Sequence, residues 1–376
     1  MEYFNQYWYK NYLQTDINLQ KSDNQYIKYS FDVLTYDSIF SGTRHQIESK
    51  YFAGRSRFFV NGNFLRNTST SENNNFYRFL TKFEHQFKGF WLGFFGNAEK
   101  NARKNNINNN FINTSHQYKE VEIYVGLGDS TKVFTKVGFN YRDNDSIKNN
   151  AFTRINDRKT IYINSKLIQN QKTSLSVFAN FRFTNNAFTM NEQSLNSRIN
   201  YQQSLIKNFI NLNTVYETSS NNVARQEFVY VQTEPGLGFY TWIDYNGDGI
   251  KDFDEFEVAI FQDQAEYLRL PKPNLTFLPT QRVKLQQTIF VSFKNWATQK
   301  GFKKMISHFD NQTYLLASNE QERNFDSFQL NPFNFDENRL VSLQLNFRNT
   351  IYYNRGLNKY TTSYTYGNSK SKQQFL

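Results

Sequence analysis

Apolar and polar residues alternate over long stretches of this chain, and the alternation restricts its fold more than any other property of the sequence. A period of two residues places successive side chains on opposite faces of an extended strand. In residues 131–141 the polar-rich face holds Lys132, Lys136 and Asn140. The opposite face holds Val133, Thr135, Val137, Phe139 and Tyr141. Residues 282–294 repeat the pattern, so we predict two-faced β-strands rather than helices.

The alternating segments are also long. They run for roughly 8–13 residues, near the length that a tilted strand needs to cross a bilayer, whereas strands of soluble proteins average about 5–6 residues. We expect roughly 14–16 strands in all. They lie near 27–35, 45–52, 57–65, 77–87, 90–98, 117–127, 131–141, 159–168, 174–184, 194–205, 209–217, 223–232, 281–294, 340–353 and 359–367.

The apolar content comes mainly from aromatic residues. The chain has 376 residues with 39 Phe and 25 Tyr, yet only 38% of it is hydrophobic. Soluble domains rely more on Leu, Val, Ile and Ala. An apolar band, aromatic girdles and a polar interior are typical of a transmembrane barrel. No stretch approaches the roughly 18 apolar residues of a spanning helix. We therefore predict an all-β fold, an antiparallel up-and-down transmembrane β-barrel or part of one, over residues 1–376.

The connections between the expected strands alternate in length. Short turns are expected at FAGRS, Lys88-Gly89, GDS and QNQK, and long polar links at RNTSTSENNN, NARKNNINNNFINTS and RDNDSIKNNAFTRIND. Bacterial barrels have short periplasmic turns and longer extracellular loops. The pattern favours the outer membrane of a Gram-negative bacterium. The alternative fold is a soluble antiparallel β protein, a sandwich or solenoid, whose apolar face forms an internal core.

The N-terminal run MEYFNQYWYKNYLQ lacks the basic and apolar regions of a signal peptide. An exported barrel needs such a signal. We therefore expect the sequence to be a piece of a longer precursor, and we expect neighbouring sequence to complete the barrel.

An acidic insert at 233–280 interrupts the strand pattern. Within it, residues 244–255 match the calcium-loop pattern D-x-[DN]-x-[DN]-G-x5-E. In such a loop, oxygens converge on a hard cation and glycine allows a sharp turn. The expected ligands are Asp244, Asn246, Asp248, Asp252 and Glu255, with the backbone carbonyl of Ile250. Lys251 departs from the aliphatic residue usual at its position, and no helix pair flanks the loop. We predict one structural Ca²⁺; a turn rich in Asp, Asn and Gly without metal is the alternative.

The same segment resembles a family. The run WIDYNGDGIKDFDEFEVAIFQDQAEYLRL is similar to a segment of large, poorly characterised outer-membrane β-barrel proteins of Bacteroidota. Their W-x-D-x-N-x-[DN]-G-I-x-x-x-x-E-F-E and D-Q-A-x-[YF] elements are matched by Trp242, Asp244, Asn246, Asp248, Gly249, Ile250, Glu255, Phe256, Glu257, Asp263, Gln264, Ala265 and Tyr267. The resemblance covers about thirty residues. It implies the fold and the location, and it implies no substrate.

Enzymatic function is not indicated. The chain has no cysteine, and no G-x-S-x-G, P-loop or G-x-G-x-x-G motif. His45, His85, His116 and His308 are far apart in sequence and form no metal-binding motif. The carboxylates of 252–257 lie in an acidic loop that does not promise the desolvation that acid–base catalysis needs. We predict a non-enzymatic protein.

The net charge of +11 comes without a dense basic run. We therefore expect a basic lumen or rim rather than a nucleic-acid site, since the latter concentrates its basic residues. Expected partners are outer-membrane lipid, the phosphates of lipopolysaccharide, and other outer-membrane or periplasmic proteins. Two functions stay open: a scaffold or conduit for export, assembly or transport, and a surface adhesin. A soluble β-sheet binding module is a third. Counting strands from 27–35 places the insert at a short periplasmic turn, so we predict a periplasmic or plug position.

Overall fold

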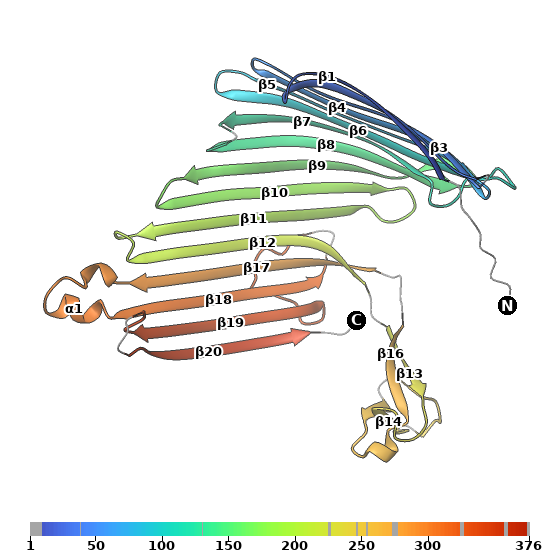
Figure 1. Ribbon diagram of the computed structural model, residues 1–376. Helices are drawn as coiled ribbons and strands as arrows, with labels where there is room; N and C mark the ends of the chain where they lie inside the picture. Colours follow the sequence, from blue (N-terminus) through green and yellow to red (C-terminus); the bar gives the residue numbers. More distant parts are fainter. Residues whose placement is uncertain are drawn as a thin grey trace. The chain divides into compact units, whose positions relative to one another are not determined.

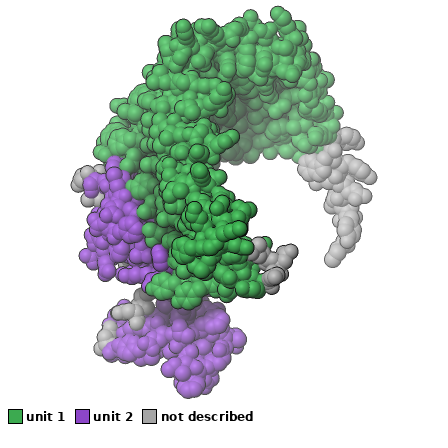
Figure 2. Space-filling view, turned by 90° about the vertical axis from the view of Figure 1, so that its left-hand side faces the viewer, with its two compact units in different colours: residues 1–219, 285–315, 348–366 green, residues 220–284, 316–347, 367–376 purple. Residues whose placement is uncertain are grey.

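The computed structural model describes residues 10–37, 39–129, 131–224, 227–245, 247–252, 255–272, 277–323, 327–356 and 360–373. These residues form one sixteen-stranded sheet and one four-stranded sheet. By its contacts the chain divides into two compact units, which Figure 2 colours separately. Unit 1 comprises 1–219, 285–315 and 348–366, and unit 2 comprises 220–284, 316–347 and 367–376.

The large sheet is antiparallel, and its strands follow one another in chain order (Figure 1). This arrangement confirms the predicted all-β, up-and-down architecture and the predicted number of strands. The strands are β1 (Lys10–Ser22), β2 (Gln25–Tyr36), β3 (Phe40–Ala53), β4 (Ser56–Ser69), β5 (Glu72–Gln86), β6 (Phe90–Asn105), β7 (His116–Gly128), β8 (Phe134–Lys148), β9 (Ala151–Gln169), β10 (Thr173–Asn186), β11 (Glu192–Leu205), β12 (Ile210–Ala224), β17 (Phe277–Ser292), β18 (Phe309–Glu322), β19 (Leu340–Tyr353) and β20 (Thr362–Gln373).

The strands are longer than the sequence pattern predicts. Residues 142–157, expected as a long loop, belong to β8 and β9, which are joined by a two-residue turn at Asn149 and Asn150. Both asparagines have positive φ, 52° and 57°. A tight hairpin turn whose twist matches that of its strands requires this conformation, and Asn tolerates it better than most residues. The loop prediction was wrong because polar residues such as Asn144 and Asn156 pair across the strands.

One face of the sheet in unit 1 is apolar and exposed. Ile123 of β7 pairs with Phe94 of β6 and Phe139 of β8. All three side chains are exposed, Ile123 by 56%. Exposed apolar residues on the same face of neighbouring strands include Phe58, Phe83, Leu92, Val121, Val125, Leu127, Val137, Ile161 and Phe181. Within the described part of unit 1, this apolar face is therefore not packed against a second layer.

The two outermost strands of the sheet are exposed throughout. Every residue of β1 and every residue of β20 is exposed. Each of these strands ends the strand order and so has one hydrogen-bonded neighbour. A strand with one neighbour leaves a row of backbone N–H and C=O groups without a ladder partner on its outer side.

The predicted strand at 223–232 is wrong in its assignment. β12 continues to Ala224, while β13 (Glu227–Gln232) pairs with β16 (Tyr267–Lys272) in the four-stranded sheet. Counted from β2, which corresponds to the predicted strand at 27–35, eleven strands of the large sheet precede the insert instead of the predicted twelve. The connection from β12 to β17 leaves the large sheet at the same strand ends as the connections 106–115 and 187–191. This removes the basis for the predicted periplasmic position of the insert.

The insert forms its own small sheet within unit 2. Its strand order is β13-β16-β14-β15, with β14 (Tyr240–Trp242) and β15 (Phe256–Val258) as a short hairpin. Tyr230 and Phe256 stack with ring centroids 3.9 Å apart, and Tyr267 packs edge-on against Phe256. Tyr267 and Ala265 are buried, by 95% and 99%. These contacts give the insert a small aromatic core of its own.

Helices are few in the part of the chain that the structure describes. They are the 3-10 turns η2 (Gln262–Gln264) and η3 (Lys294–Trp296) and the single α-helical turn α1 (Phe302–Ile306). None of the described helices is long and apolar enough to span a membrane.

Candidate functional site: the polar face and the acidic insert

The face of the large sheet opposite the apolar one carries linked charges. Glu122 of β7 accepts hydrogen bonds from Lys136 Nζ of β8, at 3.2 Å, and from the hydroxyl of Tyr162 of β9. Lys136 Nζ also lies 3.6 Å from the centroid of the Tyr124 ring. Tyr124 in turn donates to Glu84 of β5 at 3.0 Å. A connected network of this kind satisfies polar groups on a half-buried surface and fixes their positions.

Aromatic rings of this polar face lie over glycines of the neighbouring strands. Tyr124 is the cross-strand partner of Gly93, and a Cβ added to Gly93 would come within 2.0 Å of the Tyr124 ring. Trp91 covers Gly126 in the same way. Trp91 and Tyr124 are 4% and 6% exposed. Glycine is required at these positions because the ring occupies the space of a side chain, not because of the backbone angles.

Three arginines from neighbouring strands gather on the polar face, and we call them the arginine cluster. Arg142 of β8 and Arg158 of β9 are direct cross-strand partners. Arg182 of β10 joins them through its Nε, which donates to Thr160 at 3.2 Å. Like charges directly opposite each other destabilise a strand pair. Arg142 has Glu120 at 3.6 Å, but the side chain of Arg158 makes no hydrogen bond or ion pair with the residues that the structure describes.

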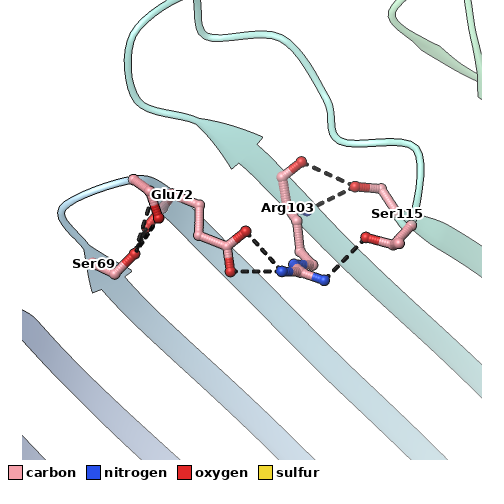
Figure 3. A network of polar contacts seen from close by, with 6 residues as sticks. Ser69, Glu72, Arg103 and Ser115 are labelled. Atoms are coloured by element: carbon pink, nitrogen blue, oxygen red, sulfur yellow. Dashed lines mark hydrogen bonds and ion pairs between the residues drawn. The ribbon is translucent and has the colours of Figure 1, made fainter.

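The connection between β6 and β7, at 106–115, is tied to the sheet through Arg103 of β6 (Figure 3). One Nη of Arg103 donates to both carboxylate oxygens of Glu72, each at 2.8 Å, and the other donates to Thr114. Ser115 is fully buried and bonds both the N–H and the carbonyl of Arg103. The ion pair with Glu72, the hydrogen bond to Thr114 and the buried serine together fix the end of the loop.

The predicted calcium loop is the loop of the hairpin between β14 and β15. Its first ligand, Asp244, accepts the N–H of Gly247 at 2.7 Å and of Gly249 at 2.9 Å. Gly247 and Gly249 have φ of 78° and 70°, which only glycine adopts without strain. Asp248 accepts the N–H of Ile250 at 2.7 Å. The loop therefore turns sharply around the carboxylate of Asp244.

Glu255 lies at the other end of this loop, directly before β15. It is 96% buried. Its Oε2 accepts the indole N–H of Trp242 at 2.9 Å and the N–H of Asp252 at 3.3 Å. Its Oε1 is buried and has no hydrogen-bond partner among the described residues. A buried carboxylate oxygen without a partner is costly, so this atom calls for an explanation.

The predicted ligands are brought to one loop, but their carboxylates are not gathered. Asp244 is half-buried, whereas Asp248, Ile250 and Asp252 are exposed. Asn246 lies outside the described residues. Among the residues that are described, no group of three His, Asp or Glu side chains is positioned to hold a metal. The four histidines are not brought together either; His116, for example, contacts Glu99 of the neighbouring strand β6.

Sequence reasoning missed the arginine cluster and the glycine–aromatic pairs. Both depend on which residues of adjacent strands lie opposite each other. The alternation does place Arg158 and Arg182 on the polar face of their strands, but the pairing register decides that Arg158 faces Arg142. Hairpin turn lengths, which set the register, were the missing information.

Comparisons with known proteins give structural similarity at low sequence identity. No protein-family model matches the chain, and no curated protein matches its sequence. The solved structures that it resembles include the siderophore receptor PirA from Pseudomonas aeruginosa, with 8% identity and a TM-score of 0.41. The match covers 96% of this chain, which spans 63% of the length of PirA.

Two further similar structures have comparable scores. The unliganded ferric citrate transporter FecA shows 11% identity and a TM-score of 0.38, over 93% of this chain and 63% of FecA. The outer membrane transporter YddB from Escherichia coli shows 10% identity and a TM-score of 0.40, over 97% of this chain and 55% of YddB. At these identities and scores the likeness assigns no family and no ligand to this chain.

Proposed function

We propose that the sixteen-stranded sheet is the wall of a β-barrel in the outer membrane of a Gram-negative bacterium. The observation that carries the proposal is the pair of unlike faces in unit 1. One face exposes Ile123, Phe94 and Phe139 on three adjacent strands, while the other holds the Glu122–Lys136 network. Soluble monomers rarely expose a continuous apolar face of this kind. In a bilayer the apolar face contacts lipid and the polar face lines the interior.

The role that fits this wall is a non-enzymatic conduit for large molecules, with lipid and lipopolysaccharide around it. Charged and amide side chains cover the polar face of β5 to β9, and their hydrogen bonds hold them in place. A polar surface of this kind suits a water-filled interior, because its charged and amide groups can remain hydrated there while the other face contacts lipid. The resemblance to Bacteroidota proteins in the insert agrees with this location and remains a prediction.

The first experiment on this proposal is fractionation of the native, full-length protein. We expect recovery in the outer membrane, with a folded band that shifts on boiling before electrophoresis. Membrane barrels resist detergent at room temperature because their closed ladder satisfies every backbone group. Recovery as a soluble protein would overturn the proposal, since the apolar face would then have to be covered by protein.

The arginine cluster makes the proposed conduit selective for anionic groups. No described carboxylate forms an ion pair with the side chain of Arg158, which lies beside Arg142 and Arg182, although Glu120 and Glu192 attract it from further away. Clustered guanidinium groups bind carboxylates and phosphates well. We expect the full-length protein in a planar bilayer to pass anions in preference to cations.

The substitution Arg158→Gln tests this selectivity. We expect the reversal potential under a salt gradient to move toward the cation-selective direction, because the local field weakens. Lys300→Gln is the matched control: it removes the same charge from the exposed connection between β17 and β18. Equal shifts in the two variants would contradict a role for the arginine cluster and would leave the membrane location untouched.

A further inference from the structure

We propose that Asp244, Asp248, Ile250 and Glu255, in the hairpin between β14 and β15, bind Ca²⁺, with Glu255 as the closing ligand. The proposal concerns unit 2 alone and does not depend on the function of the large sheet. It combines a sequence spacing with a structural observation that is independent of that spacing. The observation is the buried Oε1 of Glu255, which lacks a partner among the described residues.

The small sheet brings the two ends of the loop together. Trp242 and Phe256 are cross-strand partners, and the N–H of Ile243 donates to the carbonyl of Glu255 at 2.9 Å. The backbone at the first ligand position, Asp244, therefore lies close to the backbone at the last, Glu255, although the two are eleven positions apart in sequence. A calcium loop normally has its ends placed by flanking helices. Here the paired strands β14 and β15 place the two ends of the loop, so no helix pair is needed.

Glu255 is positioned before any ion binds. Its Oε2 is held by the indole N–H of Trp242 and by the N–H of Asp252, so the carboxylate cannot swing out to solvent. Such partners behind a ligand orient it toward the metal. Its Oε1 is buried and has no donor among the described residues, and a bound cation would compensate its charge. The unpaired Oε1 therefore indicates a positively charged ligand.

The donor set indicates the kind of cation. Carboxylates of Asp244, Asp248 and Glu255 and the carbonyl of Ile250 are all oxygen donors, and the described loop contains no sulfur or imidazole. Hard cations prefer such ligands. The exposed and separate positions of Asp248 and Asp252 favour Ca²⁺ over Mg²⁺, because Ca²⁺ accepts irregular geometry whereas Mg²⁺ demands a near-ideal octahedron. Binding would draw these exposed carboxylates toward Glu255.

Terbium luminescence measures this site directly in the full chain. Tb³⁺ replaces Ca²⁺ at oxygen sites, and an indole close to it transfers excitation energy. Trp242 is hydrogen-bonded to Glu255, so Tb³⁺ at the loop should emit on excitation of the indole and should be displaced by Ca²⁺. We expect an affinity in the range of about 10⁻⁴–10⁻³ M, as in extracellular calcium modules.

Glu255→Gln should weaken binding by about tenfold or more, at least as much as the loss of a group that merely orients a ligand. The control Asp263→Asn removes an exposed carboxylate of η2, outside the loop, and should leave the titration unchanged. Should Glu255→Gln fail to fold, Asp248→Asn replaces an exposed ligand that the small core does not need. It should also weaken binding.

Limited proteolysis of the insert gives a second measurement. Ca²⁺ should protect the loop in the native sequence and in Asp263→Asn, but not in Glu255→Gln. Sensitised emission that Ca²⁺ does not displace would overturn the proposal. So would an affinity that is the same in Glu255→Gln, Asp248→Asn and the native sequence.

Discussion

Ile123→Lys is expected to destabilise the protein in a lipid bilayer by about 2–4 kcal/mol, the cost of a lysine near the midplane of a membrane barrel. Ile123 lies among the exposed apolar residues Val121 and Val125 of its own strand and opposite Phe94 and Phe139. If this face contacts lipid, the ammonium group must be desolvated. If it contacts water, an exposed substitution changes stability by only about 0.5 kcal/mol. Urea unfolding of the full-length protein in vesicles measures the difference.

The matched control is Ile107→Lys. Ile107 is 93% exposed and lies in the connection 106–115, beyond the strands. The chemical change is identical, so intrinsic effects of lysine cancel in the comparison. We expect Ile107→Lys to change the free energy of unfolding by about 0.5 kcal/mol or less. Similar values for the two variants would show that the apolar face is not in lipid.

Gly93→Ala is expected to destabilise the large sheet by about 1–3 kcal/mol, the usual cost of overpacking. The added Cβ would lie 2.0 Å from the Tyr124 ring. That ring is 6% exposed, and its hydroxyl is bonded to Glu84. It cannot move without losing the hydrogen bond and disturbing Lys136, which sits over it. Denaturant unfolding under the same conditions gives the free energy.

Gly96→Ala is the control on the same strand. Its added Cβ would lie 3.2 Å from the Thr81 methyl and 3.4 Å from the Phe94 ring, much further than the 2.0 Å at Gly93, so a much smaller effect is expected. A double-mutant cycle with Tyr124→Leu isolates the contact, because removing the phenol should relieve the clash in Gly93→Ala. We expect a coupling of about 0.5–3 kcal/mol. Additive effects would mean that the ring does not occupy the space beside Gly93.

The faces of the strands were predictable because the period of two is a local property. Val137 and Phe139 alternate with Lys136 and Gly138 whatever the neighbouring strand is, and the structure keeps them on opposite faces. The strand count was also predictable within its range. The ends of the strands were not predictable, because polar residues at the ends of β8 and β9 pair with each other instead of forming a loop.

The insert shows the same division. Its acidic spacing was evident from residues 244–255, since ligand positions in a loop are set by sequence separation. Its boundaries were misjudged, because β13 has the composition of a membrane strand but pairs with β16, about forty residues later. Local composition cannot distinguish the two partners. The burial of Glu255 and its bond to Trp242 follow only from the pairing of β14 with β15.

By itself the sequence determined an antiparallel β architecture, the apolar and polar faces of its strands, and the position of one acidic loop. These properties depend on periodicity and spacing along the chain. Only the tertiary structure decided that Arg158 lies opposite Arg142, that Tyr124 covers Gly93, and that a buried oxygen of Glu255 has no partner among the described residues. Such contacts are set by register between strands, and a shift of one residue would exchange every face.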